Sequence, residues 1–185
     1  MEVNEIRQLK DLCLHTRLTG DGAPLACIVI PSGEPYPRLA QAIQQAVRAA
    51  SGVQLPIRLD TEILPEEIRQ TNGIVLGNLA ENRLIETLYY QWYTLVDRSY
   101  PGPGGYVLHT VHDPWGTGHN VIIVGASDAD GMANAAAEFQ QRGHPLGRGD
   151  QQGGGARHVQ EPPRDTGRPE PRDAEAAPPR GVRGG

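Results

Sequence analysis

The side chains that could perform chemistry are concentrated in residues 105–131. His109, His112 and His119 fall there with Asp113 and Trp115, so this stretch holds three of the six histidines and one of the two tryptophans. Imidazole and carboxylate groups are ligands for zinc and related cations, and histidine also titrates near neutral pH. This stretch is therefore the first place to look for a metal, catalytic or binding site.

The spacing of these residues argues against a metal centre. In a strand, His109 and His112 have opposite parity, so their side chains point to opposite faces. His112 and His119 could meet Asp113 across a hairpin, but this gives at most three ligands on a loop, without HExxH spacing. We predict no metal and no other cofactor. One alternative stays open, a small α/β ligand-binding domain or metal-dependent enzyme that uses His112, Asp113 and His119.

Trp115 lies in the sequence DPWGTG, a predicted turn between two strands. Connecting turns run over the protein surface, so burial of this side chain within its own domain is hard to achieve. An exposed tryptophan can contact a sugar or a neighbouring domain. We predict such a contact surface from Trp115, His112, Asp113 and His119. The other tryptophan, Trp92, lies on the apolar stripe of a predicted helix and is expected in the core.

Other catalytic signatures do not emerge from the sequence. Ser32 and Ser127 lack the GxSxG pattern, and Cys13 and Cys27 have no CxxC spacing. None of the strand-to-helix loops matches a phosphate-binding glycine motif. The loop at Ser127, expected to cap a helix, is followed by two aspartates that would repel a phosphate. We therefore predict no catalytic residue in this chain.

Alternating strands and helices must position these residues. Short β-rich apolar runs predict strands, and apolar positions at helical spacing predict helices. The predicted strands are 25–30, 55–60, 73–78, 106–112 and 119–125; the predicted helices are 38–52, 81–97 and 127–139, with a single turn within 64–72. This order predicts an α/β fold with a layered sheet of about five strands and about three packed helices. The last two strands are expected to form an antiparallel hairpin, which makes the sheet mixed.

Composition divides the chain into three parts. Residues 1–22 form a polar N-terminal lead, residues 23–140 form the α/β domain, and residues 141–185 form a tail rich in glycine, proline and arginine. The tail is predicted to be disordered, because it cannot bury enough apolar surface to offset its ordering entropy. A native linker and a frameshifted, non-native end are both open interpretations of the tail.

Charge and hydropathy narrow the function classes. A net charge of −5 gives no electrostatic reason to expect nucleic acid or an anionic membrane as a partner. The N-terminus is charged throughout, so it does not resemble a signal peptide. No apolar run approaches the roughly 20 residues that cross a bilayer. The chain is predicted to be soluble, and its compartment stays unassigned.

Four motifs in residues 23–140 resemble those of a known domain family. They are Gly52–Ile57 after a helix, Ile74–Gly77 ending a strand, Gly105–Leu108, and Gly125–Gly131 before a final helix. Together they are similar to the small α/β domain that precedes the catalytic domain in carbohydrate-active enzymes such as β-hexosaminidases and α-glucuronidases. The catalytic acids of that family lie in the following domain, so the resemblance assigns none here. It implies a non-catalytic accessory domain, a fragment whose partner is the catalytic domain of a glycoside hydrolase-like parent, with a glycan as an open second ligand.

Overall fold

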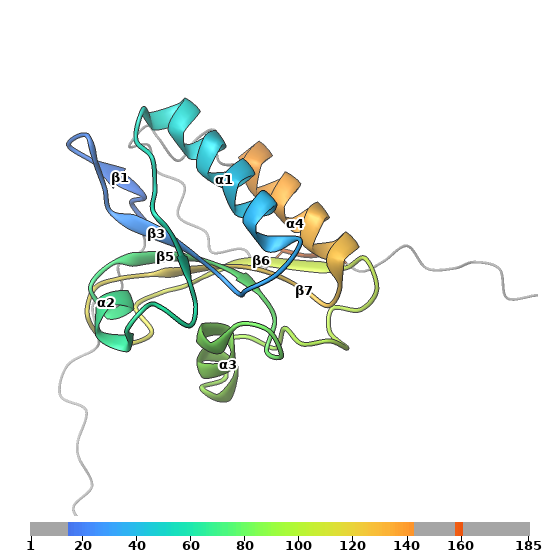
Figure 1. Ribbon diagram of the computed structural model, residues 1–185. Helices are drawn as coiled ribbons and strands as arrows, with labels where there is room; N and C mark the ends of the chain where they lie inside the picture. Colours follow the sequence, from blue (N-terminus) through green and yellow to red (C-terminus); the bar gives the residue numbers. More distant parts are fainter. Residues whose placement is uncertain (1–14, 143–157, 161–185) are drawn as a thin grey trace, which may run out of the picture.

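A mixed β-sheet with helices on both faces forms the body of the protein (Figure 1). The computed structural model describes residues 15–142 and the backbone of 158–160. The elements in chain order are β1 (Thr19–Gly20), β2 (Ala23–Pro24), β3 (Ala26–Ile30), α1 (Tyr36–Ser51), β4 (Ile57–Leu59), α2 (Pro65–Arg69), β5 (Asn72–Gly77), α3 (Arg83–Tyr90), β6 (Tyr106–Val111), β7 (Val121–Ala126), α4 (Ala129–Arg142) and β8 (His158–Gln160).

The strand order of the main sheet is β4-β3-β5-β7-β6-β8. The strands β4, β3, β5 and β7 run parallel, whereas β6 pairs antiparallel with β7. The predicted α/β fold with a mixed five-strand sheet, β3 to β7, is confirmed, and so is the hairpin across DPWGTG. Each predicted strand overlaps an observed one, and the single turn expected within residues 64–72 is α2.

Two hydrophobic clusters lie on opposite faces of the sheet. Helices α1 and α4 lie side by side on one face, and α2 and α3 lie on the other (Figure 1). Because successive residues of a strand point to opposite faces, Ile28 and Ile74 belong to the α1/α4 cluster, while Val29 and Val75 belong to the α2/α3 cluster. Burial of each such side chain stabilises the fold by about 1.5–3 kcal/mol relative to exposure.

Helix α1 shows how local sequence sets an element. Its apolar positions Ala40, Ile43 and Val47 are spaced by three or four residues and face the sheet. Gly52 ends the helix with φ of 76°, and its N–H donates to the carbonyl oxygen of Arg48 at 2.8 Å. Among the helices of the described residues, none is long and apolar enough to cross a bilayer.

Helix α3 is shorter than the predicted helix 81–97. It begins after Asn82, whose side-chain oxygen accepts hydrogen bonds from the N–H groups of Leu84 and Ile85 at 2.9 and 3.4 Å. It ends at Tyr90, seven residues before the predicted end. A residue with left-handed backbone conformation, Trp92 at φ of 62°, stops the helix there.

Backbone hydrogen bonds at the end of α3 close a Schellman motif. The N–H of Trp92 donates to the carbonyl oxygen of Tyr89 at 2.9 Å, and the N–H of Tyr93 donates to that of Leu88 at 3.0 Å. This turn directs the Trp92 side chain into solvent, where it is 81% exposed. The prediction that Trp92 belongs to the core is therefore wrong, because the helix on which it rested has already ended.

The start of the described chain extends the domain beyond the predicted boundary between residues 22 and 23. Strands β1 and β2 pair antiparallel across that boundary. Leu18 is buried and belongs to the α1/α4 cluster. The last described residues of the polar lead are thus packed on the domain, and residues 1–14 lie outside the described residues.

A small part of the tail lies among the described residues. Helix α4 runs to Arg142, and His158–Gln160 forms β8, which pairs antiparallel with β6. An edge strand such as β6 presents unpaired N–H and C=O groups, which an extended segment can bind whatever its side chains. The rest of 141–185 lies outside the described residues.

Candidate functional site

Asp113 organises the loop between β6 and β7. Its side chain is 3% exposed, and its Oδ1 accepts hydrogen bonds from the N–H groups of Thr117 and Gly118 at 2.7 and 2.9 Å. The N–H of Asp113 donates to Oδ1 of the buried Asn120 at 2.9 Å. The carboxylate thus closes its own loop, which is a structural use of this side chain.

His112 and His119 flank that loop and are half-buried. Within the described residues, no group of three or more histidine, cysteine, aspartate or glutamate side chains is placed to hold a metal ion. The Asp113 carboxylate is already engaged by backbone N–H groups. The structure therefore provides no assembled ligand set for the alternative function that uses His112, Asp113 and His119.

Trp115 is half-buried. It packs against the cluster on the α2/α3 face, together with Tyr93 and Leu84. Apolar packing thus accounts for much of its surface. The predicted role of Trp115 in contacting a glycan or another domain stays a prediction for the part of the side chain that remains exposed.

The carboxyl ends of β3 and β5 form the topological switch point of the sheet. From β3 the chain moves to β4 on one side through α1, and it returns to β5 on the other side through α2. Ligands of α/β proteins bind in the crevice between two such strand ends. Here the phenol of Tyr36 donates to Oε2 of Glu81. Nδ2 of Asn78 donates to the same Oε2 at 3.3 Å and to the carbonyl oxygen of Ala126 at 3.1 Å.

In this network the protein's own side chains hydrogen-bond to one another at the switch point. Tyr36 and Asn78 are buried. Burial raises the pKa of the Tyr36 phenol well above its usual range, and the hydrogen bond to Glu81 raises it further. Tyr36 therefore stays a protonated donor at neutral pH and does not act as a base. The side chains at the switch point tie three strand ends together.

The motif before α4 also has a structural role. Asp128, rather than the predicted Ser127, caps α4, since its Oδ1 accepts a hydrogen bond from the N–H of Gly131 at 2.8 Å. Oδ2 of the same carboxylate accepts a hydrogen bond from the N–H of Gly104 at 2.9 Å. A Cβ atom on Gly131 would collide with the carbonyl oxygen of Gly105. The glycine therefore allows the loop before β6 to pack closely on the first turn of α4.

A cavity of about 170 Å³ lies beside β3 and β4 and is lined partly by Cys27, Arg58, Glu67 and Thr71. Burial raises the pKa of the Cys27 thiol to about 11, so the thiol is protonated at neutral pH and is a poor nucleophile. Arg58 and Glu67 form an exposed ion pair at 3.6 Å. The Cys27 thiol stays neutral, and Arg58 and Glu67 pair with each other. The cavity therefore does not combine a nucleophile with a general base.

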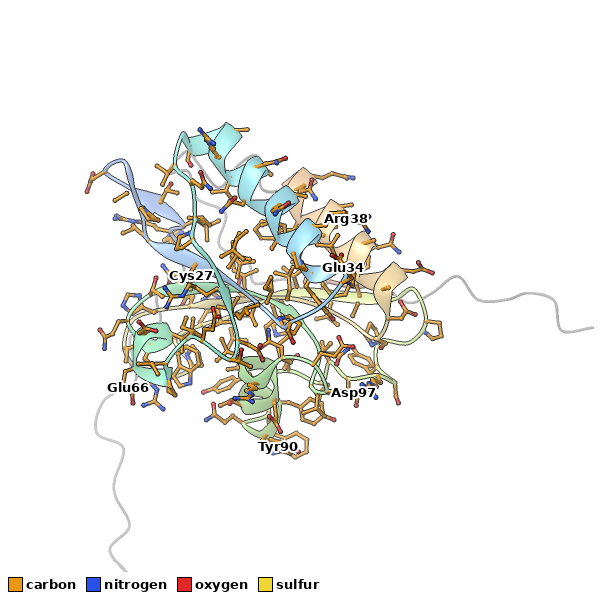
Figure 2. The ribbon with its side chains drawn as sticks, viewed as in Figure 1. Cys27, Glu34, Arg38, Glu66, Tyr90 and Asp97 are labelled. Atoms are coloured by element: carbon orange, nitrogen blue, oxygen red, sulfur yellow. The ribbon has the colours of Figure 1, made fainter. Side chains whose placement is uncertain are left out.

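An exposed segment follows α3, and it includes Trp92, which the sequence pattern placed in the core. We call residues 90–100 the aromatic segment, because Tyr90, Trp92 and Tyr100 are exposed there, together with Leu95. Tyr90 lies at the outer end of α3 and points away from the sheet (Figure 2). Leu84, Leu88 and Trp92 have the spacing of one buried helical stripe, so the sequence pattern predicts burial of Trp92 and not its exposure.

The aromatic segment is fixed to the sheet and to the β6–β7 loop. Nε2 of His109 lies 3.2 Å from the carbonyl oxygen of Tyr93, and the Tyr93 hydroxyl donates to the carbonyl oxygen of Pro114 at 3.3 Å. The N–H of Leu79 donates to the carbonyl oxygen of Val96 at 3.0 Å, and the Val96 side chain is fully buried. Part of the stretch 105–131 thus supports the aromatic segment.

Comparisons with known proteins assign no family to the chain. No protein-family model matches the chain. No curated protein is significantly similar to it in sequence.

Proposed function

We propose that this chain is a non-catalytic accessory domain of a carbohydrate-processing enzyme of the glycoside hydrolase type, working beside a catalytic domain of its parent protein. The observation that carries the proposal is the aromatic segment, which is exposed to solvent and anchored to the sheet by hydrogen bonds. Exposed tryptophan and tyrosine side chains are typical of surfaces that bind a partner, because they combine a large apolar area with a polar end.

The resemblance of residues 23–140 to accessory domains supports the same proposal. Its motifs have structural uses here: Gly52 ends α1, and Gly131 allows the close contact of a loop with α4. In an accessory domain whose catalytic acids lie in another domain, the shared motif residues are expected to form the fold and not an active site.

The buried acids of the described residues fit a supporting role better than catalysis. Glycoside hydrolysis takes two carboxyl groups about 5–10 Å apart across a cleft. Oδ2 of Asp60 accepts a hydrogen bond from the N–H of Arg83 at 2.9 Å, at the start of α3. The Asp113 carboxylate closes the β6–β7 loop. Each is used by the backbone around it.

The contact with a catalytic domain is proposed for the β6–β7 loop. His112, Trp115 and His119 lie in this loop or at its ends and are partly exposed, while the buried Asp113 holds the loop in shape. The Tyr93 hydroxyl links the loop to the aromatic segment through Pro114. A surface made of both would let a glycan and a neighbouring domain bind side by side.

The proposal is tested by assaying the purified chain for release of reducing ends from cellulose, xylan, chitin and starch, with heat-denatured chain as the control. We expect no release above the control, and we expect the coding region next to this domain to encode a glycoside hydrolase-like catalytic domain. Turnover by the chain alone would contradict the non-catalytic assignment, and an adjoining region without any carbohydrate-active domain would contradict the assignment to such enzymes.

A further inference from the structure

We infer that Trp92 is a sugar-stacking residue, whose indole binds the apolar C–H face of a neutral pyranose unit in a glycan chain. The inference rests on the proposed function, and it goes further by naming the residue and the class of ligand. It depends on three features of the aromatic segment: the backbone conformation of Trp92, the exposure of its side chain and the rigidity of its surroundings.

The backbone conformation of Trp92 is one that glycine normally provides. Trp92 occupies the residue after the C-cap of α3, with φ of 62°, and the hydrogen bonds of Trp92 and Tyr93 complete the Schellman motif. Glycine is the usual residue at this position, because a Cβ atom crowds the backbone in the left-handed conformation. A tryptophan here raises the energy of the turn.

Packing does not compensate for that unfavourable position. With 81% of its surface exposed, the Trp92 side chain contributes little apolar burial to the fold. A bulky side chain that strains the backbone and stays in solvent is explained by a ligand that covers it. Residues in such sparsely populated conformations are concentrated at binding and catalytic sites.

Hydrogen bonds hold the segment that follows Trp92. Oδ1 of Asp97 accepts hydrogen bonds from the N–H groups of Ser99 and Tyr100, both at 2.7 Å. The Tyr89 hydroxyl donates to Oδ2 of Asp97 at 3.3 Å. A tryptophan side chain has few rotatable bonds, so on a fixed loop it loses little conformational entropy when it binds, which favours a weakly interacting ligand such as a sugar.

The exposed apolar side chains of the aromatic segment offer enough area for a pair or row of sugar rings. Exposed fractions of 70% for Tyr90, 81% for Trp92, 44% for Leu95 and 39% for Tyr100 correspond to on the order of 500 Å², if each side chain offers roughly 150–250 Å².

The polar residues of the aromatic segment suit a neutral sugar. Gln91 and Arg98 place an amide and a guanidinium between the exposed aromatics along the chain, and these groups can form hydrogen bonds with ring hydroxyls. The net charge of −5 disfavours a strongly anionic glycan. A neutral chain of pyranose units therefore matches both the apolar and the polar groups.

The test uses isothermal titration calorimetry of the full chain with cellohexaose, xylohexaose, chitohexaose and maltohexaose. We expect at least one hexasaccharide to bind, and we expect Trp92→Gly and Trp92→Ala each to weaken that binding tenfold or more. Leu64→Ala is the matched control, because Leu64 is an exposed apolar side chain outside the aromatic segment. Circular dichroism checks that each variant is folded, and Trp92→Gly is expected to fold because glycine suits the turn.

The outcomes separate this inference from the proposed function. If a hexasaccharide binds the wild-type chain and the Trp92 variants equally well, the inference is overturned, while the accessory role in carbohydrate processing stands. If no hexasaccharide binds, or if Trp92→Gly changes only the oligomeric state measured by sedimentation, the sugar-stacking role is overturned. The proposed function is then decided by the hydrolysis assay and the adjoining coding region.

Discussion

The stability of two Trp92 variants tests whether α3 ends in a Schellman motif with Trp92 in the left-handed conformation. Trp92→Ala and Trp92→Gly both remove the indole, so contacts of that ring are lost equally in the two proteins. The variants differ in what the backbone tolerates, because alanine keeps a Cβ atom at φ of 62° and glycine does not. The comparison therefore isolates the left-handed conformation.

The expected difference follows from opposing backbone effects. A left-handed conformation costs an L-residue about 1–2 kcal/mol, and glycine avoids this cost. Glycine gives up about 0.5–1 kcal/mol because its unfolded chain has more freedom. We expect Trp92→Gly to be more stable than Trp92→Ala by about 1 kcal/mol. If the helix continued through residue 92, alanine would be favoured by about 1 kcal/mol instead.

Urea unfolding followed by circular dichroism measures both free energies of unfolding. With unchanged dependence on urea, the midpoint for Trp92→Gly is expected above that for Trp92→Ala. Thermal unfolding should give midpoints about 3–5 °C apart, in the same order. A higher stability for Trp92→Ala would refute the left-handed turn and, with it, the argument that Trp92 occupies a glycine position.

Three other residues give further predictions. The Cys27 thiol has a pKa near 11 in the folded chain against 9.0 when exposed, so the unfolded chain loses this proton first. The stability that comes from the neutral Cys27 thiol is fully present below pH 9, and the free energy of unfolding falls by about 2–3 kcal/mol between pH 9 and 11 as the unfolded chain loses the proton. Urea unfolding of the Cys13→Ser protein should show this loss, and adding Cys27→Ala should make the loss smaller. Asp113→Ala should lower the free energy of unfolding by about 2–3 kcal/mol, since it leaves two N–H groups without their charged acceptor; a thermal midpoint equal to that of wild type would contradict the role of Asp113 in its loop. Gly131→Ala should cost about 1–3 kcal/mol, because the added methyl group meets backbone; wild-type stability in the same urea assay would show that the loop before β6 does not pack as described.

The fold was predictable because its strands and most of its helices are specified locally. Continuous apolar runs such as Ala26–Ile30 mark strands buried on both faces, and the spacing of Ile43 and Val47 marks a helix with one apolar stripe. Gly52 ended α1 as its type predicts. The order of these elements was enough to predict a mixed α/β sheet.

The end of α3 was not predictable from periodicity. Leu84, Leu88 and Trp92 are each four residues apart, which is the spacing of a continuous helical stripe. The helix stops because Trp92 adopts a conformation for which tryptophan has no preference, and no glycine or proline marks the position. Trp92 is therefore exposed and not part of the core, while Trp115 is half-buried.

The candidate site was only partly predictable, because tertiary partners decide what a side chain does. The sequence drew attention to Asp113, but its partners are backbone N–H groups of its own loop, which composition does not reveal. His109 lies beside the carbonyl oxygen of Tyr93, sixteen residues earlier in the chain. The hairpin within residues 105–131 was predicted and is present, while the exposure of Trp92 beside it was not predicted.

The contact between Trp92 and a sugar is tested by following the two indole N–H signals in a nitrogen–proton correlation spectrum of the full chain during titration with the hexasaccharide that binds. The chain has two tryptophans, and the signal missing from Trp92→Gly identifies Trp92. We predict that the Trp92 signal shifts progressively with sugar and reaches saturation. A Trp92 signal that stays in place while the sugar binds would contradict the claim that Trp92 is the sugar-stacking residue.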